Sequence, residues 1–286
     1  MRRKYSRRAV EAFFLLLMRA STILVLACLV IIVGTMFIKG IGAMSLEMIT
    51  RTPAGGFYLG REGGVLNAII GSCLLTAAAT GIAFMLSVPL VLYLNLFTKK
   101  GSRFAAWVRM SLDLLWGTPS IVYGAFGFII MIALGIPSSL LGGMITVAIL
   151  ILPLMARAMD EVVSMVSPEL LEASYSLGAN KTETAFRVVL RQAAPGMVSA
   201  LLIAFGRGIG DAASVLFTAG FSDMIPRSLL QPAATLPLAV FFQLASPLPE
   251  VQARAYASAL ILTIIILIAS ISARLIARRL NRHIIR

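Results

Sequence analysis

Six long apolar runs set the tightest limit on what this chain can fold into. The run from Ala20 to Ile38 has no charged residue over 19 positions, enough for a helix to cross a hydrocarbon layer of about 30 Å. A helix is the only option for a lipid-facing segment that is not a barrel strand, because it satisfies its own backbone hydrogen bonds. We therefore predict an all-α, polytopic membrane protein with six transmembrane helices, at roughly residues 14–38, 66–96, 104–133, 140–157, 196–220 and 254–275.

The composition agrees with a lipid environment. Of the 286 residues, 59% are hydrophobic and 13% are charged, whereas soluble domains carry about a quarter charged residues. A net charge of +13 would also suit a nucleic-acid-binding protein, but the lysines and arginines come in short groups at the ends of the apolar runs. We expect contacts with membrane lipid and no nucleic-acid partner. The two cysteines, Cys28 and Cys73, are expected to be free, buried and unreactive.

The basic residues also predict an orientation. With the N-terminus in the cytoplasm, the inside segments hold most of the lysines and arginines, which places both termini inside. We interpret the first run as a retained span, since no small-residue cleavage site of a secretory signal follows it. The expected divisions are a basic N-terminus (1–13), a first helix (14–38), an external loop (39–65), a core of five helices (66–275) and a basic tail (276–286), with the core containing an inside loop at 160–195 and an external loop at 221–253.

Short features refine this outline. The stretch LPLAVFFQLA in the second external loop is too short to span and is expected to form an interfacial or re-entrant helix. Pro89 and Pro119 are expected to kink or interrupt the second and third helices. Asp113 lies four residues from Arg109, and we expect a local ion pair between them.

The inside loop has the signals of a helix, a turn and a second helix. Ser167 can cap a first helix that starts at Pro168, and Gly178 can end it in the left-handed conformation. Asn180, with Glu183 three residues on, has the pattern of a capping box for the second helix. The loop either folds against its own bundle or serves as a docking element for a cytoplasmic partner.

The fifth run carries two charges, Arg207 and Asp211. Spaced by four, they would share one face of a continuous helix, and each alone would cost about 2.5–3.5 kcal/mol at a membrane centre. The pair belongs either to a substrate path or to a structural lock. Arginine suits an oxyanion because its planar fork donates two parallel hydrogen bonds. Asp211 would hold Arg207 when no anion is bound.

Two further patterns allow alternative interpretations. Ser72, Thr76 and Thr80 recur every four residues in the second helix, and this hydroxyl stripe can line a pathway or hold helices together. The glycines around Arg207, in GRGIG, superficially match a nucleotide-binding loop. Because they lie in a span and do not follow a strand, close helix packing is the better interpretation.

The chemistry that the chain lacks excludes several classes. The sequence contains no G-x-x-x-x-G-K-[ST] nucleotide-binding motif and no cysteine–histidine metal cluster, and its single histidine, His283, lies in the tail. We expect no enzyme activity, no metal and no cofactor bound by this chain.

The inside loop resembles the EAA loop of ABC-type importer permeases. In the stretch EASYSLGANKTETAFRVVL, Ser174 stands where that loop has its second alanine, and Arg191 stands where it usually has proline. The resemblance implies that this loop inserts a short helix into a cleft of an ATPase subunit. The positions that it assigns to ATPase coupling are Glu172, Ala173, Ser174, Gly178, Val188 and Leu190.

Three more stretches resemble phosphate importer permeases, and among them the A-type subunit. They are PSIVYGAF at 119–126, RGIGDAASVLFTAG at 207–220, and QPAATLPLAVF at 231–241 followed by SP. The family has Gly-Glu-Thr-Ala-Pro where this chain reads Gly-Asp-Ala-Ala-Ser, so Asp211 stands for glutamate and Ser214 for proline. The resemblance implies a type I ABC importer permease fold and a substrate path that contains Arg207.

The resemblance also implies a complex in a bacterial-type inner membrane. Its members would be a second permease subunit, which makes a heterodimer rather than a homodimer, two ATPase subunits that use ATP, and an external phosphate-binding protein. The alternatives are an importer of another oxyanion or small solute and a non-transporting membrane scaffold.

Overall fold

Helices make up most of the part of the chain that the computed structural model describes, residues 2–54, 62–99 and 101–281. Each of the six predicted apolar runs contains helix, although the third is interrupted and the fifth includes a non-helical segment. The elements in chain order are α1 (Arg2–Ile41), α2 (Leu46–Thr50), β1 (Pro53–Ala54), β2 (Glu62–Gly63), α3 (Leu66–Leu92), η1 (Tyr93–Phe97), α4 (Arg103–Trp116), α5 (Ser120–Ala133), α6 (Leu140–Ser164), α7 (Pro168–Ser176), α8 (Lys181–Glu183), η2 (Thr184–Val189), α9 (Leu190–Ile209), α10 (Val215–Thr218), α11 (Leu236–Leu244) and α12 (Pro249–Asn281).

Five helical segments of the described chain are long and apolar enough to cross a membrane. A sixth span results if α4 and α5, which meet at a bend of 98°, are counted together. The bend falls at Gly117–Pro119, with Pro119 as the N-cap of α5, so the expected interruption at this proline is confirmed. The other predicted break is milder, because α3 continues through Pro89 and changes to the wider π-helical segment η1 four residues later.

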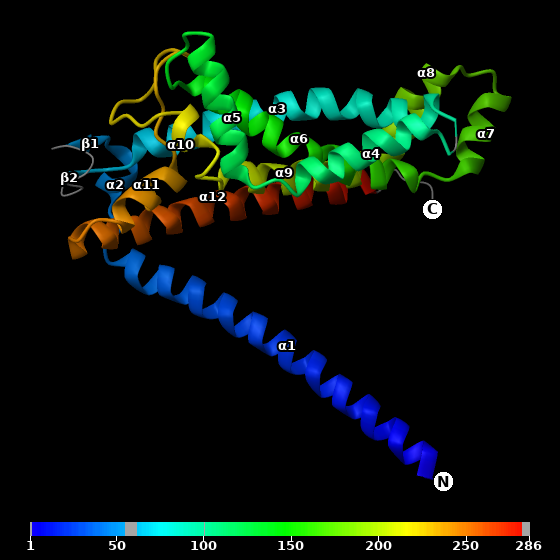
Figure 1. Cartoon of the computed structure of the whole chain (residues 1–286), viewed down its shortest axis with the longest axis horizontal. Coiled ribbons are helices and arrows are strands. Elements are labelled where there is room, and N and C mark those ends of the chain that lie inside the picture. The colour runs from blue at the N-terminus through cyan, green and yellow to red at the C-terminus, as the bar shows by residue number, and fades with distance from the viewer. Residues whose placement is uncertain (1, 55–61, 100, 282–286) are drawn as a thin grey trace.

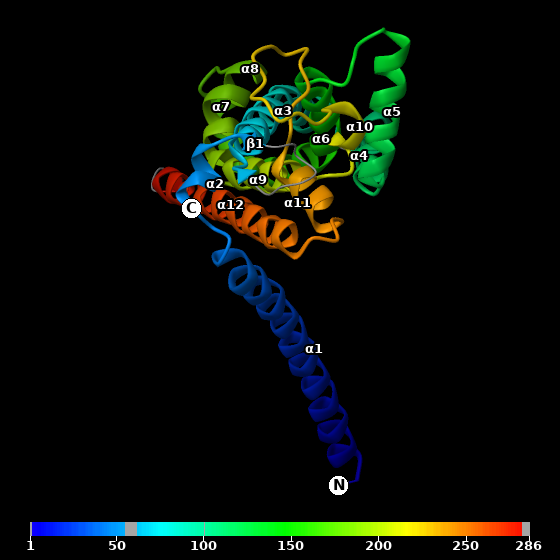
Figure 2. The ribbon, with the colours of Figure 1, turned by 90° about the vertical axis from the view of Figure 1, so that its left-hand side faces the viewer.

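The long helices form an elongated bundle, and the two ends of the bundle differ. Figure 1 shows α3, α6, α9 and α12 running along the long axis, with α7 and α8 at one end and α2 with the β1–β2 hairpin at the other. We call the end with α7 and α8 the loop end. The helix α1 joins the bundle at the opposite end and then leaves it, as Figures 1 and 2 both show. The most apolar window of α1 has none of its residues buried within the chain.

Small residues let α3 approach its neighbours closely. A Cβ atom added at Gly71 would lie 2.0 Å from the carbonyl oxygen of Ala234, just before α11. The neighbouring Ser72 accepts a hydrogen bond of 2.8 Å from the backbone nitrogen of Leu236. Helix α11 covers LPLAVFFQL, and half of its residues are buried against α3 and α12, so the expected short helix is confirmed and lies within the bundle. Small residues at helix interfaces are the usual device for close packing in membranes.

Two boundaries differ from the sequence expectation. The fourth span does not end near residue 157, because α6 continues to Ser164. The fifth span does not run through residues 196–220. Instead, α8, η2 and α9 form one helical stretch from Lys181 to Ile209, and a non-helical segment follows. The loop between these spans is therefore much shorter than 160–195, and the second helix expected within it is the start of the fifth span.

The two cysteines are free, as expected, but the expectation that they are buried is wrong. Cys28 and Cys73 are both exposed on the surface of this chain. Apolar spans expose side chains to lipid rather than to water, so an exposed position in a span suits a weakly polar thiol.

Candidate functional site

The loop between α6 and α8 has the geometry of a helix that stops abruptly. Gly178 has a φ of +85°, a conformation that favours glycine. Its amide donates to the carbonyl of Tyr175 at 2.9 Å, and the amide of Ala179 donates to the carbonyl of Ser174 at 3.2 Å. This pair of bonds is the Schellman motif, which satisfies the free carbonyls at the end of α7.

The helix that follows starts with the capping box expected from the sequence. The side chain of Asn180 accepts from the amide of Glu183 at 2.8 Å, and the Glu183 carboxylate accepts from the amide of Asn180 at 3.0 Å. At the start of α7, Ser167 occupies the N-cap position next to Pro168, but its hydroxyl contacts the carboxylate of Glu169 instead of a backbone amide. This hydrogen bond lowers the pKa of Glu169, which keeps a negative charge at the positive end of α7.

The predicted coupling residues divide into inward and outward groups. Ser174 is buried, and its hydroxyl lies 2.9 Å from the hydroxyl of Thr184, which ties α7 to the start of the fifth span. Glu172 and Ala173 are exposed, whereas Val188 and Leu190 are half-buried. Serine in place of the motif's alanine therefore has a structural reason, because it makes this hydrogen bond.

Apolar side chains are exposed around this turn. Leu177 is 89% exposed, Phe186 53% and Tyr175 40%, and all three lie at the loop end. Exposed apolar groups among charged ones are typical of a protein–protein contact surface. A cavity of about 510 Å³ lies between this loop and the segment that joins η1 to α4, and its lining includes Asn95, Arg109, Pro168 and Leu171.

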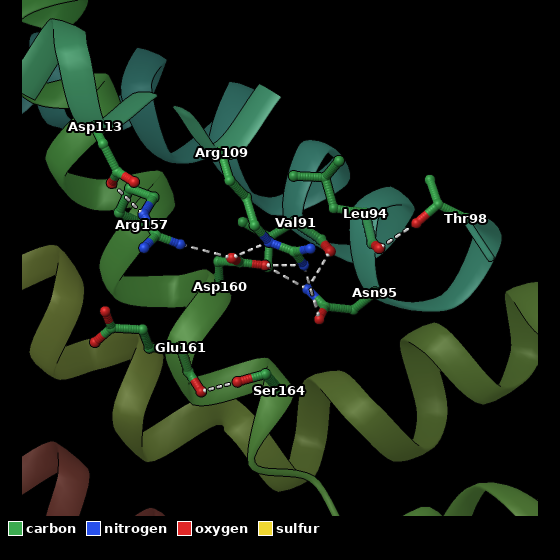
Figure 3. Close-up of polar contacts among 10 residues, drawn as sticks. All are labelled: Val91, Leu94, Asn95, Thr98, Arg109, Asp113, Arg157, Asp160, Glu161 and Ser164. Atoms are coloured by element: carbon green, nitrogen blue, oxygen red, sulfur yellow. Dashed lines mark hydrogen bonds and ion pairs between the residues drawn. The ribbon is translucent and has the colours of Figure 1, made fainter. Parts of the chain in front are cut away.

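A charged network lies beside that cavity, where α3 continues as η1 and where α4 and α6 come together. Figure 3 shows Asp160 at its centre, with Asn95, Arg109 and Arg157 pointing toward it. Nε of Arg109 lies 2.7 Å from Oδ2 of Asp160, and its Nη2 lies 3.0 Å from Oδ1. Nδ2 of Asn95 donates to Oδ1 at 2.7 Å, and Nη1 of Arg157 donates to Oδ2 at 3.0 Å. Both oxygens of one carboxylate therefore join three elements.

The expected local pair of Asp113 with Arg109 is wrong. Arg109 pairs with Asp160 on α6, and Asp113 pairs with Arg157, whose Nε lies 2.6 Å from Oδ1 of Asp113. The side chain of Asp160 is 5% exposed and that of Asp113 is 49% exposed, so the buried carboxylate attracts the arginine more strongly. Neither Asp160 nor Asn95 was among the residues expected to form a site. The available signal was the i,i+3 spacing of Arg157 and Asp160 at the end of an apolar run.

The structure separates Arg207 from Asp211. Arg207 lies in the last turn of α9 and is exposed, whereas Asp211 lies beyond the end of the helix at Ile209. The two therefore do not share a helix face. Oδ2 of Asp211 accepts from the backbone nitrogen of Ser214 at 2.8 Å. The turn that follows α9 packs against α5, because a Cβ added at Gly124 would lie 2.8 Å from the carbonyl oxygen of Ala213.

The hydroxyl stripe on α3 lies inside the bundle. Ser72 and Thr76 are 1% exposed and Thr80 is 5% exposed. Ser72 bonds to the start of α11, and Thr76 would be 3.4 Å from a Cβ added at Gly208 on α9. These contacts favour the helix-packing role over the pathway role in this conformation. Close contact supports the packing role at Gly208 alone, because a Cβ added at Gly206 would meet nothing within 4 Å and one at Gly210 would meet only the carbonyl oxygen of Gly206.

Comparison with known proteins is consistent with this architecture. Residues 87–286 match the family described as binding-protein-dependent transport system inner membrane component. The chain is 31% identical to the phosphate transport system permease protein PstA of Haemophilus influenzae, covering 96% of this chain and 95% of that protein. It is 33% identical to PstA of Yersinia pestis, covering 94% and 90%.

Among solved structures, the fold is similar to an inward-facing MetNI methionine ABC transporter. The TM-score is 0.62 at 16% identity, covering 75% of this chain and 95% of that one. An amino acid ABC transporter gives a TM-score of 0.55 at 20% identity. These structures support the all-helical permease fold alone. The match over residues 87–286 and the near full-length relatives show that this chain belongs to the family of binding-protein-dependent transport system inner membrane components.

Proposed function

We propose that this chain is a permease subunit of an ATP-driven ABC importer for inorganic phosphate. The observation that carries this proposal is its similarity to phosphate permeases along nearly the whole length of both chains. The chain forms part of the translocation path and binds no cofactor itself. A partner subunit hydrolyses the ATP.

Arg207 is our candidate for the residue that meets the anion. It lies at the end of a membrane-length helix, it is exposed on the surface of this single chain, and the turn that follows it packs against α5. Irregular backbone at membrane depth is tolerated where it is buried or lines a water-filled cavity. A guanidinium in such a place can donate two parallel hydrogen bonds to a tetrahedral oxyanion and stays charged at any working pH.

The long fifth span offers a mechanical link from the loop to this arginine. One helical stretch runs from Lys181, beside the turn at Gly178, to Ile209, two residues beyond Arg207. At 1.5 Å per residue this stretch reaches roughly 40 Å. The bond between Ser174 and Thr184 joins α7 to it. Motion of docked ATPase subunits therefore displaces α7 and the fifth span together, which switches the path between outward and inward access.

The remaining partners complete the complex. One of the two ATPase subunits docks on the loop end through Glu172, Ala173 and the exposed apolar side chains beside them, and the other docks on the second permease subunit. A second, different permease subunit makes the heterodimer and covers apolar surface that this chain leaves exposed, above all α1. An external phosphate-binding protein delivers the substrate at the opposite end.

Both termini lie in the cytoplasm in this proposal, in a bacterial-type inner membrane. The basic groups at the two ends of the sequence support this side. In Figure 1 the N-terminal end of α1 and the C-terminal end of α12 both point toward the loop end, where the ATPases dock.

Phosphate uptake by the assembled importer in proteoliposomes tests the proposal. Arg207→Ala should lower phosphate uptake at least tenfold. Arg207→Lys should restore only part of the uptake, because lysine keeps the positive charge but lacks the planar guanidinium that donates two parallel hydrogen bonds. Arg191→Ala is the matched control, since Arg191 is an exposed arginine near the other end of the same helical stretch. Full uptake by the Arg207→Ala variant would remove this residue from the path.

Competition between solutes for uptake identifies the transported solute, and a variant of the coupling loop distinguishes a transporter from a scaffold. An excess of sulfate, molybdate or an amino acid should leave uptake of labelled phosphate unchanged, and inhibition by one of them would point to another solute. Glu172→Ala should uncouple ATP hydrolysis from uptake. A scaffold would show no such loss.

A further inference from the structure

The segment after Arg207 is a built turn rather than a frayed helix end. The helix α9 ends at Ile209, and the chain enters α10 at Val215. Between them, Oδ2 of Asp211 accepts a 2.8 Å hydrogen bond from the backbone nitrogen of Ser214. An aspartate that accepts from a backbone amide three residues ahead closes a turn, and Ser214, whose amide Asp211 holds, is itself the N-cap residue of α10.

The far side of this turn is held by close packing. A Cβ added at Gly124 on α5 would lie 2.8 Å from the carbonyl oxygen of Ala213 and 3.0 Å from Cα of Ser214. The hydroxyl of Thr218 donates to the carbonyl of Ser214 at 2.9 Å, and the carbonyl of Thr218 accepts from the amide of Ser139 at 2.8 Å. The turn is therefore fixed by α5 and α6 at one end, and by the Asp211 cap at the end nearer to Arg207.

The same contacts leave the arginine available. Within the described part of the chain, Arg207 has no ion-pair partner. The carboxylate of Asp211, four positions on, is directed to a backbone amide. A substrate-binding guanidinium that need not first leave a carboxylate binds an anion more readily.

We propose that Asp211 is a positioning residue, which caps Ser214 and holds the turn that presents an unpaired Arg207 to the transported anion. This inference rests on the proposed function, and it replaces the role of Asp211 as a charge partner of Arg207. The cap depends on the hydrogen-bond acceptor of Asp211 and not on its charge.

The backbone amide of Ser214 needs a hydrogen-bond acceptor. Ser214 is completely buried, so its N–H cannot be satisfied by bulk water. The short side chain of aspartate reaches an amide three residues ahead, and Asp211 supplies that acceptor.

Phosphate uptake by the full importer, with its partner subunits and binding protein, separates the two roles. Asparagine caps as well as aspartate but carries no charge, so Asp211→Asn should keep uptake within about twofold of the parent. Asp211→Ala removes the cap and should lower uptake on the order of fivefold. Asp211→Asn should also leave the pH profile of uptake unchanged.

A double-variant cycle with Ser214→Pro makes the test independent of folding losses. The φ of Ser214 is −71°, which proline can adopt, and the substitution removes the amide that Asp211 caps. Adding Asp211→Ala to Ser214→Pro should therefore change uptake, and the amount of complex in the membrane, by less than about twofold. Independent losses from the two substitutions would overturn the inference.

Equal losses in Asp211→Asn and Asp211→Ala would show that the charge matters, and unchanged uptake in both would show that the cap does not. Either result overturns the inference. The proposed function is tested separately, by uptake of phosphate by the parent importer. If another solute proves to be the substrate, the same Asn-to-Ala comparison is made with that solute.

Discussion

At the scale of single residues, the network around Asp160 shows how one buried carboxylate neutralises its surroundings. It receives both nitrogens of a bidentate contact from Arg109 and one bond each from Asn95 and Arg157. Asp113 balances the second arginine at the exposed edge. Four charges therefore sum to zero where α4 and α6 cross, and three elements are joined without an unpaired buried charge.

Removal of the central carboxylate should be far more costly than removal of the edge carboxylate. Asp160→Asn leaves two arginines beside each other in a partly buried site, and we expect a loss of about 3–5 kcal/mol in the free energy of unfolding. Asp113→Asn breaks a pair whose acid is half exposed, and we expect a loss of about 0–1 kcal/mol. Thermal unfolding of the purified complex in detergent measures both. Equal losses would contradict the central position of Asp160.

At the scale of elements, the turn at Gly178 shows why a particular residue type is needed where α7 ends. Its φ of +85° disfavours any residue with a Cβ, although a Cβ there would meet no neighbouring atom. Backbone conformation, rather than crowding, is therefore the reason for glycine at this position.

Gly178→Ala should weaken the capture of ATPase subunits. The strain of about 1–2 kcal/mol distorts the end of α7, while the spans remain folded. Co-purification of the ATPase with a tagged permease measures the effect. Gly135→Ala is the matched control, because Gly135 also has a positive φ of +66° with open space around it, but lies between α5 and α6, away from the loop end. A loss of capture in both variants would trace the effect to general instability.

Close helix packing predicts a contrast between two glycines of α3. Gly71→Ala would place a methyl group 2.0 Å from the carbonyl of Ala234, which forces the backbone before α11 to move. We expect a loss of about 1–3 kcal/mol. Gly81→Ala meets open space in the same helix and should stabilise it by roughly 1 kcal/mol. Opposite shifts in the midpoint of thermal unfolding are the expected result, and shifts of the same sign would contradict it.

At the scale of the whole molecule, the chain exposes an amount of apolar surface that only a bilayer and other subunits can cover. Helix α1 leaves the bundle completely, and just 11% of the most apolar window of α12 is buried. The buried core is concentrated in α3, α6 and α9, so the fold of the bundle does not depend on α1. Its contact with the bundle is with α12, where Gly40 lies against the backbone of Tyr256.

Two single cysteines should report the orientation of the bundle. Ser228 is exposed in the segment before α11, and Ser176 is exposed at the end of α7. In intact cells lacking an outer-membrane barrier, a membrane-impermeant maleimide should label Ser228→Cys, whereas Ser176→Cys should need permeabilised membranes. The parent chain is the control for Cys28 and Cys73. The reverse pattern would overturn the cytoplasmic placement of the loop and of both termini.

Much of the element order was predictable, because apolar length, glycine and capping residues act locally. The described chain has five membrane-length helices, or six spans if the bent α4–α5 pair is counted as one, against the six that were expected, and the Gly178 turn and the Asn180 capping box are confirmed. Errors arose where the outcome depends on distant partners. Arg109 forms its ion pair with Asp160, which is 51 positions away, and not with the nearby Asp113. Hydropathy alone also extended the fifth span past Ile209, since residues 210–220 are apolar without being part of that helix.

By itself, the sequence determined that this protein lies in a membrane, where its helices begin and turn, and which family it belongs to. These properties follow from transfer of apolar groups to lipid and from backbone conformations that a few residues enforce. Only the tertiary structure decided which charges pair, which hydroxyls are buried and that Asp211 bonds to a backbone amide rather than to Arg207. Those outcomes depend on which helices approach one another, and electrostatic pairing is decided by distance and burial in space rather than by spacing along the chain.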